Sequence, residues 1–474
     1  MTHDGAPGAD DATAAPPDVP VPTPARAGRA GGRLLRGALL VASLAAVVGL
    51  DTGVVPLPAS TAKPVVRTVA GGASAAPKYD AAADAARQKA LRTTLTALGA
   101  ALAGGNGTAA GALVDPAYAA TGKALGVLAK NLHALPSTDV SLEWAGVWTP
   151  DGTTSPNDAV VAHALVKTFV RGYDLAPGGD HVDVGMRRHG TQWLVTSWTW
   201  SKAEAPPPWT IPGLQAVTKP HVVVIGQAKN AGVNARLASR AEAAAVDARS
   251  LWKVPGWNGR AVLVATTDTG YLDTWFGTGK AGPGQPSANR FNAYVTTPGD
   301  GTSTATGFRT VLGTDFLLRD NRATRSDLRY MFTILAMQSS SDDLLPAWLY
   351  YGSADYTAWR AQGRTDPLET LRARGLADGT WSALRRRTWR PQLTDSQSTF
   401  AEGSKAKIAN DWDSAFFTVA YIVDTYGEKT LTGLLVDIGS GTATDAALRT
   451  RLHLTQDQLT AKVRAYARPL AARA

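Results

Sequence analysis

The chain has 474 residues, 44% of them hydrophobic, which leaves room for two or three domains with sizeable cores. It contains no cysteine, so disulfides, thiol catalysis and cysteine-ligated zinc are excluded. The net charge of +9 is modest for this length, and the basic residues are scattered apart from three consecutive arginines at 385–387. We interpret that run as a solvated helix end, with a polyanion site as the alternative, and we expect no nucleic-acid partner.

The first 80 residues predict a tail, a membrane segment and a linker. Residues 1–32 have almost no large apolar side chains, which predicts a disordered cytoplasmic tail. Residues 33–57 are long and apolar enough to span a membrane, with Arg36 and Asp51 near its two interfaces. We interpret them as an uncleaved transmembrane signal-anchor, and a cleaved signal peptide is the alternative. Residues 58–80 are rich in Pro, Ala, Gly and Ser and predict a linker.

Charge around the membrane segment predicts its orientation. Four arginines precede the uncharged stretch, at positions 26, 29, 33 and 36, whereas only Lys63 and Arg67 follow soon after it. Because basic residues stay on the cytoplasmic side, we expect a single-pass protein of the cell membrane with its C-terminal domains outside the cell. The expected partner of the N-terminal helix is therefore the membrane, which the helix would span.

Residues 81–204 predict an α+β domain of helices followed by a curved antiparallel sheet. Leucine spacing predicts helices at 81–103 and 116–135. Period two in the last strand places Leu194, Trp198 and Trp200 on one face. The pattern resembles the nuclear-transport-factor-2-like (cystatin-like) cone, and we expect a structural spacer because no motif marks a ligand site. The strand-like runs lie at 140–148, 159–173, 181–187 and 192–200.

A Pro-rich linker at 205–220 leads to a second α+β domain at 221–474, a small mixed sheet followed by a helical half. Short apolar runs separated by turn-rich segments predict its strands, and apolar residues at helical spacing predict its helices. The expected strands are 221–226, 261–265, 291–296 and 308–312. The clearest helices are 237–252, 268–276, 367–374, 411–426, 429–438, 444–452 and 456–467.

Two helices joined by a polar loop lie at the centre of this second domain. The first is apolar at 330–337, and the second begins at Pro346, a residue favoured in the first turn of a helix. The second helix reads Pro-x-Trp-Leu-x-x-Gly-x-Ala-Asp-Tyr over residues 346–356. With the strands before it and the helix at 411–427 after it, this motif resembles the peptidase-MA-like metallopeptidases of actinobacteria, a gluzincin group. The resemblance implies a thermolysin-like fold over about 221–470.

The resemblance also implies a zinc site, and its ligands are missing from this chain. The family carries His-Glu-x-x-His on the first helix, where two histidines bind zinc and the glutamate acts as general base. Residues 332–337 contain neither histidine nor glutamate, and no histidine occurs between His221 and His453. Tyr351 stands where the family has its third ligand, a glutamate. We therefore expect no zinc cofactor, no metal ligand and no catalytic residue.

The resulting hypothesis is a membrane-anchored extracytoplasmic protein with a catalytically degenerate metallopeptidase-like domain. Its role would be to bind or scaffold a peptide or another protein of the cell envelope. One alternative is an active zinc-dependent peptidase with non-standard ligands, and another is that the cone domain is the functional part. Asp342 and Asp343 with Asp355 are an alternative Ca or Mg site. The candidate cleft of the degenerate site would be lined by Phe332, Thr333, Ala336, Trp348, Tyr350, Tyr351, Asp355 and Tyr356.

Overall fold

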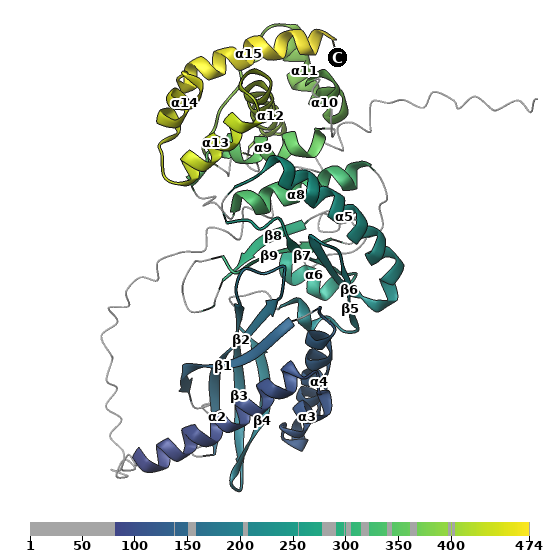
Figure 1. Ribbon diagram of the computed structural model, residues 1–474, viewed down its shortest axis with the longest axis vertical. Helices are drawn as coiled ribbons and strands as arrows, with labels where there is room; N and C mark the ends of the chain where they lie inside the picture. Colours follow the sequence, from purple (N-terminus) through teal and green to yellow (C-terminus); the bar gives the residue numbers. More distant parts are fainter. Residues whose placement is uncertain are drawn as a thin grey trace, which may run out of the picture.

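The protein is a mixed α+β structure with two sheets (Figure 1). The predicted tail, membrane segment and linker at 1–80 lie outside the residues that the structure describes. Among the described helices, none combines the length and the apolar character that a membrane crossing requires. The computed structural model describes residues 81–136, 138–149, 158–201, 207–254, 256–276, 291–297, 299, 305–313, 322–338, 344–360, 367–396, 400 and 403–473.

The N-terminal part is a four-stranded antiparallel sheet in the order β1-β2-β3-β4, on which helices α2 and α4 pack. The leucines expected on one face of the first helix, Leu91, Leu95, Leu98 and Leu102, are at most 3% exposed, which confirms that prediction. The elements are α2 (Ala81–Ala103), α3 (Gly107–Ala112), α4 (Ala119–His133), β1 (Thr138–Thr149), β2 (Ala159–Val170), β3 (Gly178–His189) and β4 (Gln192–Trp200).

The predicted face of β4 is wrong at Leu194. The pairing of β4 with β3 shifts register at Thr196, which is left without a partner on β3. An extra residue in one strand reverses the alternation of side chains beyond it. Trp193 and Val195 are therefore the buried residues before the bulge, although Trp198 lies on the predicted face after it.

The second sheet is mixed, in the order β5-β6-β7-β9-β8. Its three central strands are parallel, and the outer strands β5 and β8 run antiparallel to their neighbours. The strands expected at 261–265 and 291–296 have the predicted bounds. The elements are β5 (Leu214–Thr218), β6 (Val222–Gln227), α5 (Ala231–Leu251), β7 (Ala261–Ala265), α6 (Thr269–Phe276), β8 (Phe291–Thr296) and β9 (Gly307–Leu312).

Both faces of the second sheet are buried, which explains the continuous apolar run of β6. Val222 and Val224 belong to the core beneath α5 and the following helices. Val223 and Ile225 point the other way, into a core that they share with the leucines of α2 and the strands of the first sheet. Figure 1 shows this order of layers, with α5 and α8 on one side of β5–β9 and strands β1–β4 on the other. The two sheets are thus joined by a common core.

The structure differs from the sequence prediction at the linker expected over 205–220. Leu214–Thr218 forms the strand β5, which pairs with β6 and belongs to the second sheet. Asn131 of α4 fixes the chain just before it: its Nδ2 donates to the carbonyls of Trp209 and Ile211 at 2.7 Å. A five-residue edge strand has too short a pattern to be recognised in a Pro-rich stretch.

A buried ion pair also connects the two sheets. Asp174 follows β2, and its carboxylate accepts two hydrogen bonds from the guanidinium of Arg309 on β9, at 2.5 and 2.7 Å. The two side chains are 1% and 2% exposed. The same carboxylate accepts from the backbone N–H of Val170 at 2.7 Å, and the backbone N–H of Leu175 donates to the carbonyl of Thr306. The loop after β2 is therefore fixed to the end of β9.

The C-terminal half is helical, as predicted, and α8, α9 and α12 pack together at its centre. The helices expected at 367–374 and 444–452 have the predicted bounds, whereas α11 was not predicted. The helices are α8 (Arg322–Gln338), α9 (Ala347–Trp359), α10 (Pro367–Arg374), α11 (Asp378–Arg385), α12 (Lys405–Tyr426), α13 (Glu428–Gly439), α14 (Thr444–Leu452) and α15 (Gln456–Arg473).

Candidate functional site

The two predicted central helices are α8 and α9, and the structure brings their candidate residues together. All eight are buried, and none is more than 6% exposed. Six of the eight belong to the hydrophobic core that α8 and α9 share with α12, the exceptions being Thr333 and Asp355. These side chains therefore contribute to core packing, and their role as walls of a cleft stays a prediction. Asp342 and Asp343 lie outside the described residues.

Tyr351, which the resemblance placed at a zinc-ligand position, lies in a cluster of aromatic rings. Its ring centroid is 4.8 Å from that of Phe400, 5.4 Å from that of Trp412 and 5.1 Å from that of Tyr350. Tyr330 of α8 also lies near Trp412, and the centroids of these two rings are 6.4 Å apart. We call these five residues the aromatic cluster. Rings at such distances pack closely and fill the space between α8, α9 and α12.

The donors in this region do not fit a zinc ion. A metal ligand must be deprotonated, and burial raises the pKa of Tyr330 well above its usual value, with Tyr351 and Tyr350 adding to the effect. On α8, the hydroxyl of Thr333 donates to the carbonyl of Arg329 at 2.9 Å. No three His, Cys, Asp or Glu side chains lie together as a potential metal site within the described ranges. We therefore derive no chemical step through a metal here.

Asp355 belongs to a second buried group, which we call the Asp–Arg–Asp bridge. Arg374 of α10 donates from Nε to Asp355 of α9 at 2.7 Å, and from Nη1 to Asp413 of α12 at 2.5 Å. Asp413 also accepts from the backbone N–H of Ala377 at 3.2 Å. The guanidinium carbon lies 4.5 Å from the ring centre of Phe416. One cation therefore holds three helices together through two carboxylates.

The charges of this bridge influence one another's ionisation. Burial raises the pKa of Asp355, although the adjacent Arg374 works in the opposite direction. Burial favours the neutral form of Arg374, but Asp355 and Asp413 outweigh that effect and raise its pKa, so the guanidinium stays charged. The bridge is thus a structural joint, with its carboxylates already occupied.

Sequence reasoning identified Asp355 but missed Arg374 and Asp413 as its partners. Both lie in helices that were predicted, yet 19 and 39 positions separate the bonded residues of the two ion pairs. Hydrophobic periodicity carries no information about such distant pairs. Phe400 and Trp412 of the aromatic cluster were missed for the same reason.

Gly352 lies where α9 packs closely against α12. A β-carbon at this position would lie 2.5 Å from the carbonyl oxygen of Ala415 and 3.0 Å from a methyl group of Val419. We expect Gly352→Ala to lower the free energy of unfolding by about 1–3 kcal/mol, because overpacking outweighs alanine's higher helix propensity. Gly379→Ala is the matched control, since nothing lies within 4 Å of its β-carbon position in α11. Urea denaturation of both variants checks the prediction, and equal stability of the two would contradict it.

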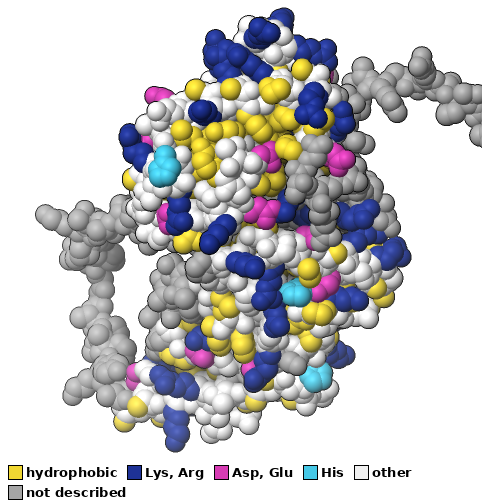
Figure 2. All heavy atoms as spheres, turned by 45° about the horizontal axis from the view of Figure 1, so that its top comes forward, with side chains coloured by type: hydrophobic (Ala, Val, Ile, Leu, Met, Phe, Trp, Pro, Cys, Tyr) yellow, Lys and Arg dark blue, Asp and Glu magenta, His cyan; other side chains and the backbone are white. Residues whose placement is uncertain are grey.

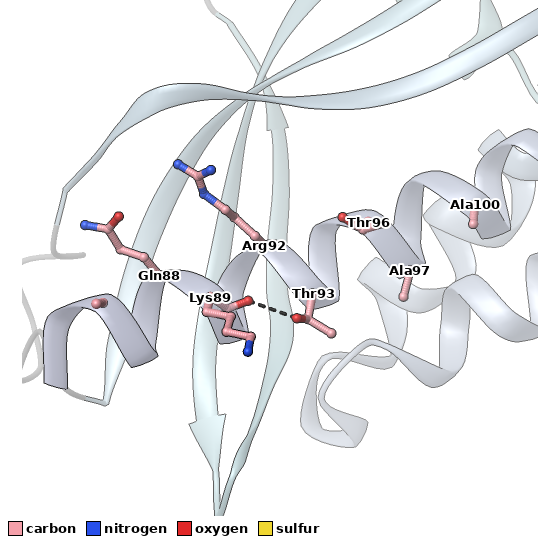
Figure 3. A pocket seen from close by; sticks show the side chains of 8 residues that line it. Gln88, Lys89, Arg92, Thr93, Thr96, Ala97 and Ala100 are labelled. Carbon is pink, nitrogen blue, oxygen red and sulfur yellow. Dashed lines mark hydrogen bonds between the residues drawn. The ribbon is translucent and has the colours of Figure 1, made fainter. Parts of the chain in front are cut away.

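Two surface hollows are lined by residues outside α8 and α9, although Trp252 and Trp257 of the second hollow contact Thr357 of α9 and Phe332 of α8. One, of about 770 Å³, runs along the exposed face of α2, where Figure 3 shows Gln88, Lys89, Arg92 and Thr93. All its described lining residues come from that one helix. The other, of about 580 Å³, includes His221, whose Nδ1 lies 2.6 Å from a carboxylate oxygen of Glu242. Neither hollow includes any of the eight candidate residues.

The chain matches no protein-family model. It also matches no curated protein.

Proposed function

We propose that the protein is a membrane-anchored, extracytoplasmic binding or scaffolding protein with a catalytically inactive metallopeptidase-like domain. In this proposal residues 33–57 are the signal-anchor, the first sheet and its helices are a nuclear-transport-factor-2-like domain, and the second sheet with α8–α15 is a thermolysin-like domain. The first would act as a rigid spacer because it shares a core with the second sheet. The partner would be a peptide or another protein of the cell envelope.

The observation that carries the loss of catalysis is the environment of Tyr351. A catalytic zinc needs three protein ligands and an open position for water. Here the ring of Tyr351 packs against both Phe400 and Trp412, which also contact each other, and these rings fill space that a ligand and a water molecule would need. Nearby Asp355 is bound to Arg374. The side chains of Tyr351 and Asp355 are thus engaged in packing and in an ion pair, whereas a hydrolase would need groups at these positions free to bind a metal or substrate.

Strand β8 supports a peptide as the partner. It is the last strand of the second sheet among the described strands, it pairs with β9 on one side, and it contacts α8. An outer strand offers backbone groups with which an extended peptide can pair. Binding of this kind needs no metal, so it is compatible with the lost ligands.

The proposal predicts the metal content of the protein. The full chain, purified with zinc present, is expected to contain much less than one zinc per chain, because no ligand set for the ion is formed. Elemental analysis of the purified protein measures the ratio directly. About one chelator-sensitive zinc per chain would instead favour an active peptidase with non-standard ligands.

A further inference from the structure

A group of six arginines, which we call the arginine cap, lies on helices α10 and α15 and at and just after the end of α11. All six are exposed except Arg464, which is half-buried. Figure 2 shows dark-blue side chains over the top of the molecule, where these helices lie in Figure 1, with few acidic side chains among them. The cap consists of Arg372, Arg385, Arg386, Arg387, Arg464 and Arg473.

Hydrogen bonds to backbone carbonyls hold the cap together. The side chain of Arg464 donates to the carbonyl of Arg387 at 3.0 Å, and that of Arg372 donates to the carbonyl of Arg473 at 2.8 Å. Arg464 and Arg473 are about 14 Å apart along α15, at 1.5 Å per residue. The six arginines are therefore spread along α15 rather than gathered at a single point.

Carboxylates do not neutralise the cap. None of its six arginines forms an ion pair with an Asp or Glu of the described chain. The neighbouring helix α14 differs, because its Arg449 and Arg451 pair with Asp445 and Asp437. Unneutralised guanidinium groups close together repel one another, and an external polyanion would relieve that repulsion.

Arg387 has a backbone conformation that is unfavourable for arginine. Its φ is +60°, and it follows the end of α11 in a turn where its N–H donates to the carbonyl of Leu384. Glycine is the usual residue in such a position, and Gly375 and Gly441 have positive φ after α10 and α13. A non-glycine residue held in the left-handed region costs conformational free energy. The arginine thus occupies a place where glycine would favour folding, which points to a use for its charge.

We propose that the arginine cap binds a flexible polymer that carries repeated phosphate groups. The guanidinium group of arginine can donate two parallel hydrogen bonds to one phosphate. Several arginines spread over a surface can contact successive phosphates of one chain, whereas a single phosphate can contact few of them. A membrane surface fits less well, because helices that lie on a membrane combine basic residues with a face of apolar side chains. The large hydrophobic side chains exposed on the described surface are Leu175, Val246 and Leu344, and none belongs to α10, α11 or α15.

The test measures binding of the full chain, held in neutral detergent micelles, to long-chain inorganic polyphosphate at several salt concentrations. The variant is R385Q/R386Q/R387Q, and the control is K123Q/K130Q/R236Q, which removes the same charge from exposed positions of α4 and α5. We expect the cap variant to lose affinity by about tenfold to a hundredfold, with a shallower salt dependence, because each phosphate contact releases counterions. The control should bind as the unmodified chain does.

A single substitution separates binding from folding. Arg387→Gly removes one cation and relieves the unfavourable φ, so it should raise the melting temperature while weakening polyphosphate binding about fivefold. Absence of binding at low salt, equal losses in the two triple variants, or unchanged binding of Arg387→Gly would each overturn the proposal. Stronger competition by phosphatidylglycerol vesicles than by polyphosphate, at equal accessible phosphate, would overturn it in favour of a membrane surface.

Discussion

Replacing Arg309 with methionine is expected to lower the free energy of unfolding by about 3–5 kcal/mol, because it leaves the carboxylate of Asp174 buried without its cation. Methionine keeps most of the apolar stem, so the loss reports on the ion pair. Asp174 and Arg309 are 1% and 2% exposed at the side chain, so the remaining carboxylate is shielded from bulk water. Because the pair connects the two sheets, both should unfold in one transition, and at lower denaturant concentration than in the unmodified chain.

The matched control is Arg171→Met, which removes an arginine three residues before Asp174 in the same loop. Arg171 pairs with Asp139 at 2.6 Å, but these side chains are 61% and 52% exposed. An exposed pair of this kind contributes at most about 1 kcal/mol. Urea denaturation followed by tryptophan fluorescence compares the two variants. Equally small losses would show that the buried pair is not the joint we infer.

Replacing Arg374 with methionine is expected to cost about 3–5 kcal/mol at pH 7, since two buried carboxylates then lose their shared cation. The substitution affects the contacts of α10 with α9 and α12 at once. Arg372→Met is the control on the same helix, because Arg372 is exposed and donates to the carbonyl of Arg473. Its expected loss is below about 1 kcal/mol.

The loss in the Arg374 variant should depend on pH, and its sign follows from Asp355. Burial raises the pKa of this carboxyl above its unfolded value, with Arg374 opposing the rise. Between the two pKa values the folded state binds more protons than the unfolded state, so stability falls as pH rises through that window. Removing Arg374 raises the folded pKa further and extends the window upward. The difference between variant and unmodified chain should therefore shrink from pH 7 to pH 5, and a constant difference would contradict this account.

Sequence periodicity predicted most of the fold for identifiable physical reasons. The leucines of α2 and the alanines of α5 recur at helical spacing and face a core, so these helices could be predicted from the sequence. The elements that were missed, α3, α11 and β5, have eight residues or fewer and lack the continuous apolar run by which the equally short strand β7 was predicted. Too few positions then exist for a period to stand out.

The sequence predicted which residues of α8 and α9 form the candidate site, but not which other residues they contact. The motif over 346–356 correctly indicated a buried helix next to an apolar one, and all eight candidate residues are buried. The partners of Tyr351 and Asp355 come from α10, α12 and residue 400, which no local pattern connects to α9. The core that the two sheets share was missed as well. Both faces of β6 carry similar apolar residues, so the sequence does not show which face packs against the first sheet.

The most direct test of the central claim is the zinc content of the full chain after expression and purification with zinc present. Elemental analysis before and after dialysis against a chelator gives the ratio of metal to protein. The account predicts well below one zinc per chain, on the order of 0.1 or less, and no change in folding after chelation, because a catalytic zinc would need three free ligands. About one zinc per chain that the chelator removes, with loss of peptide cleavage, would contradict the claim that this fold is catalytically inactive.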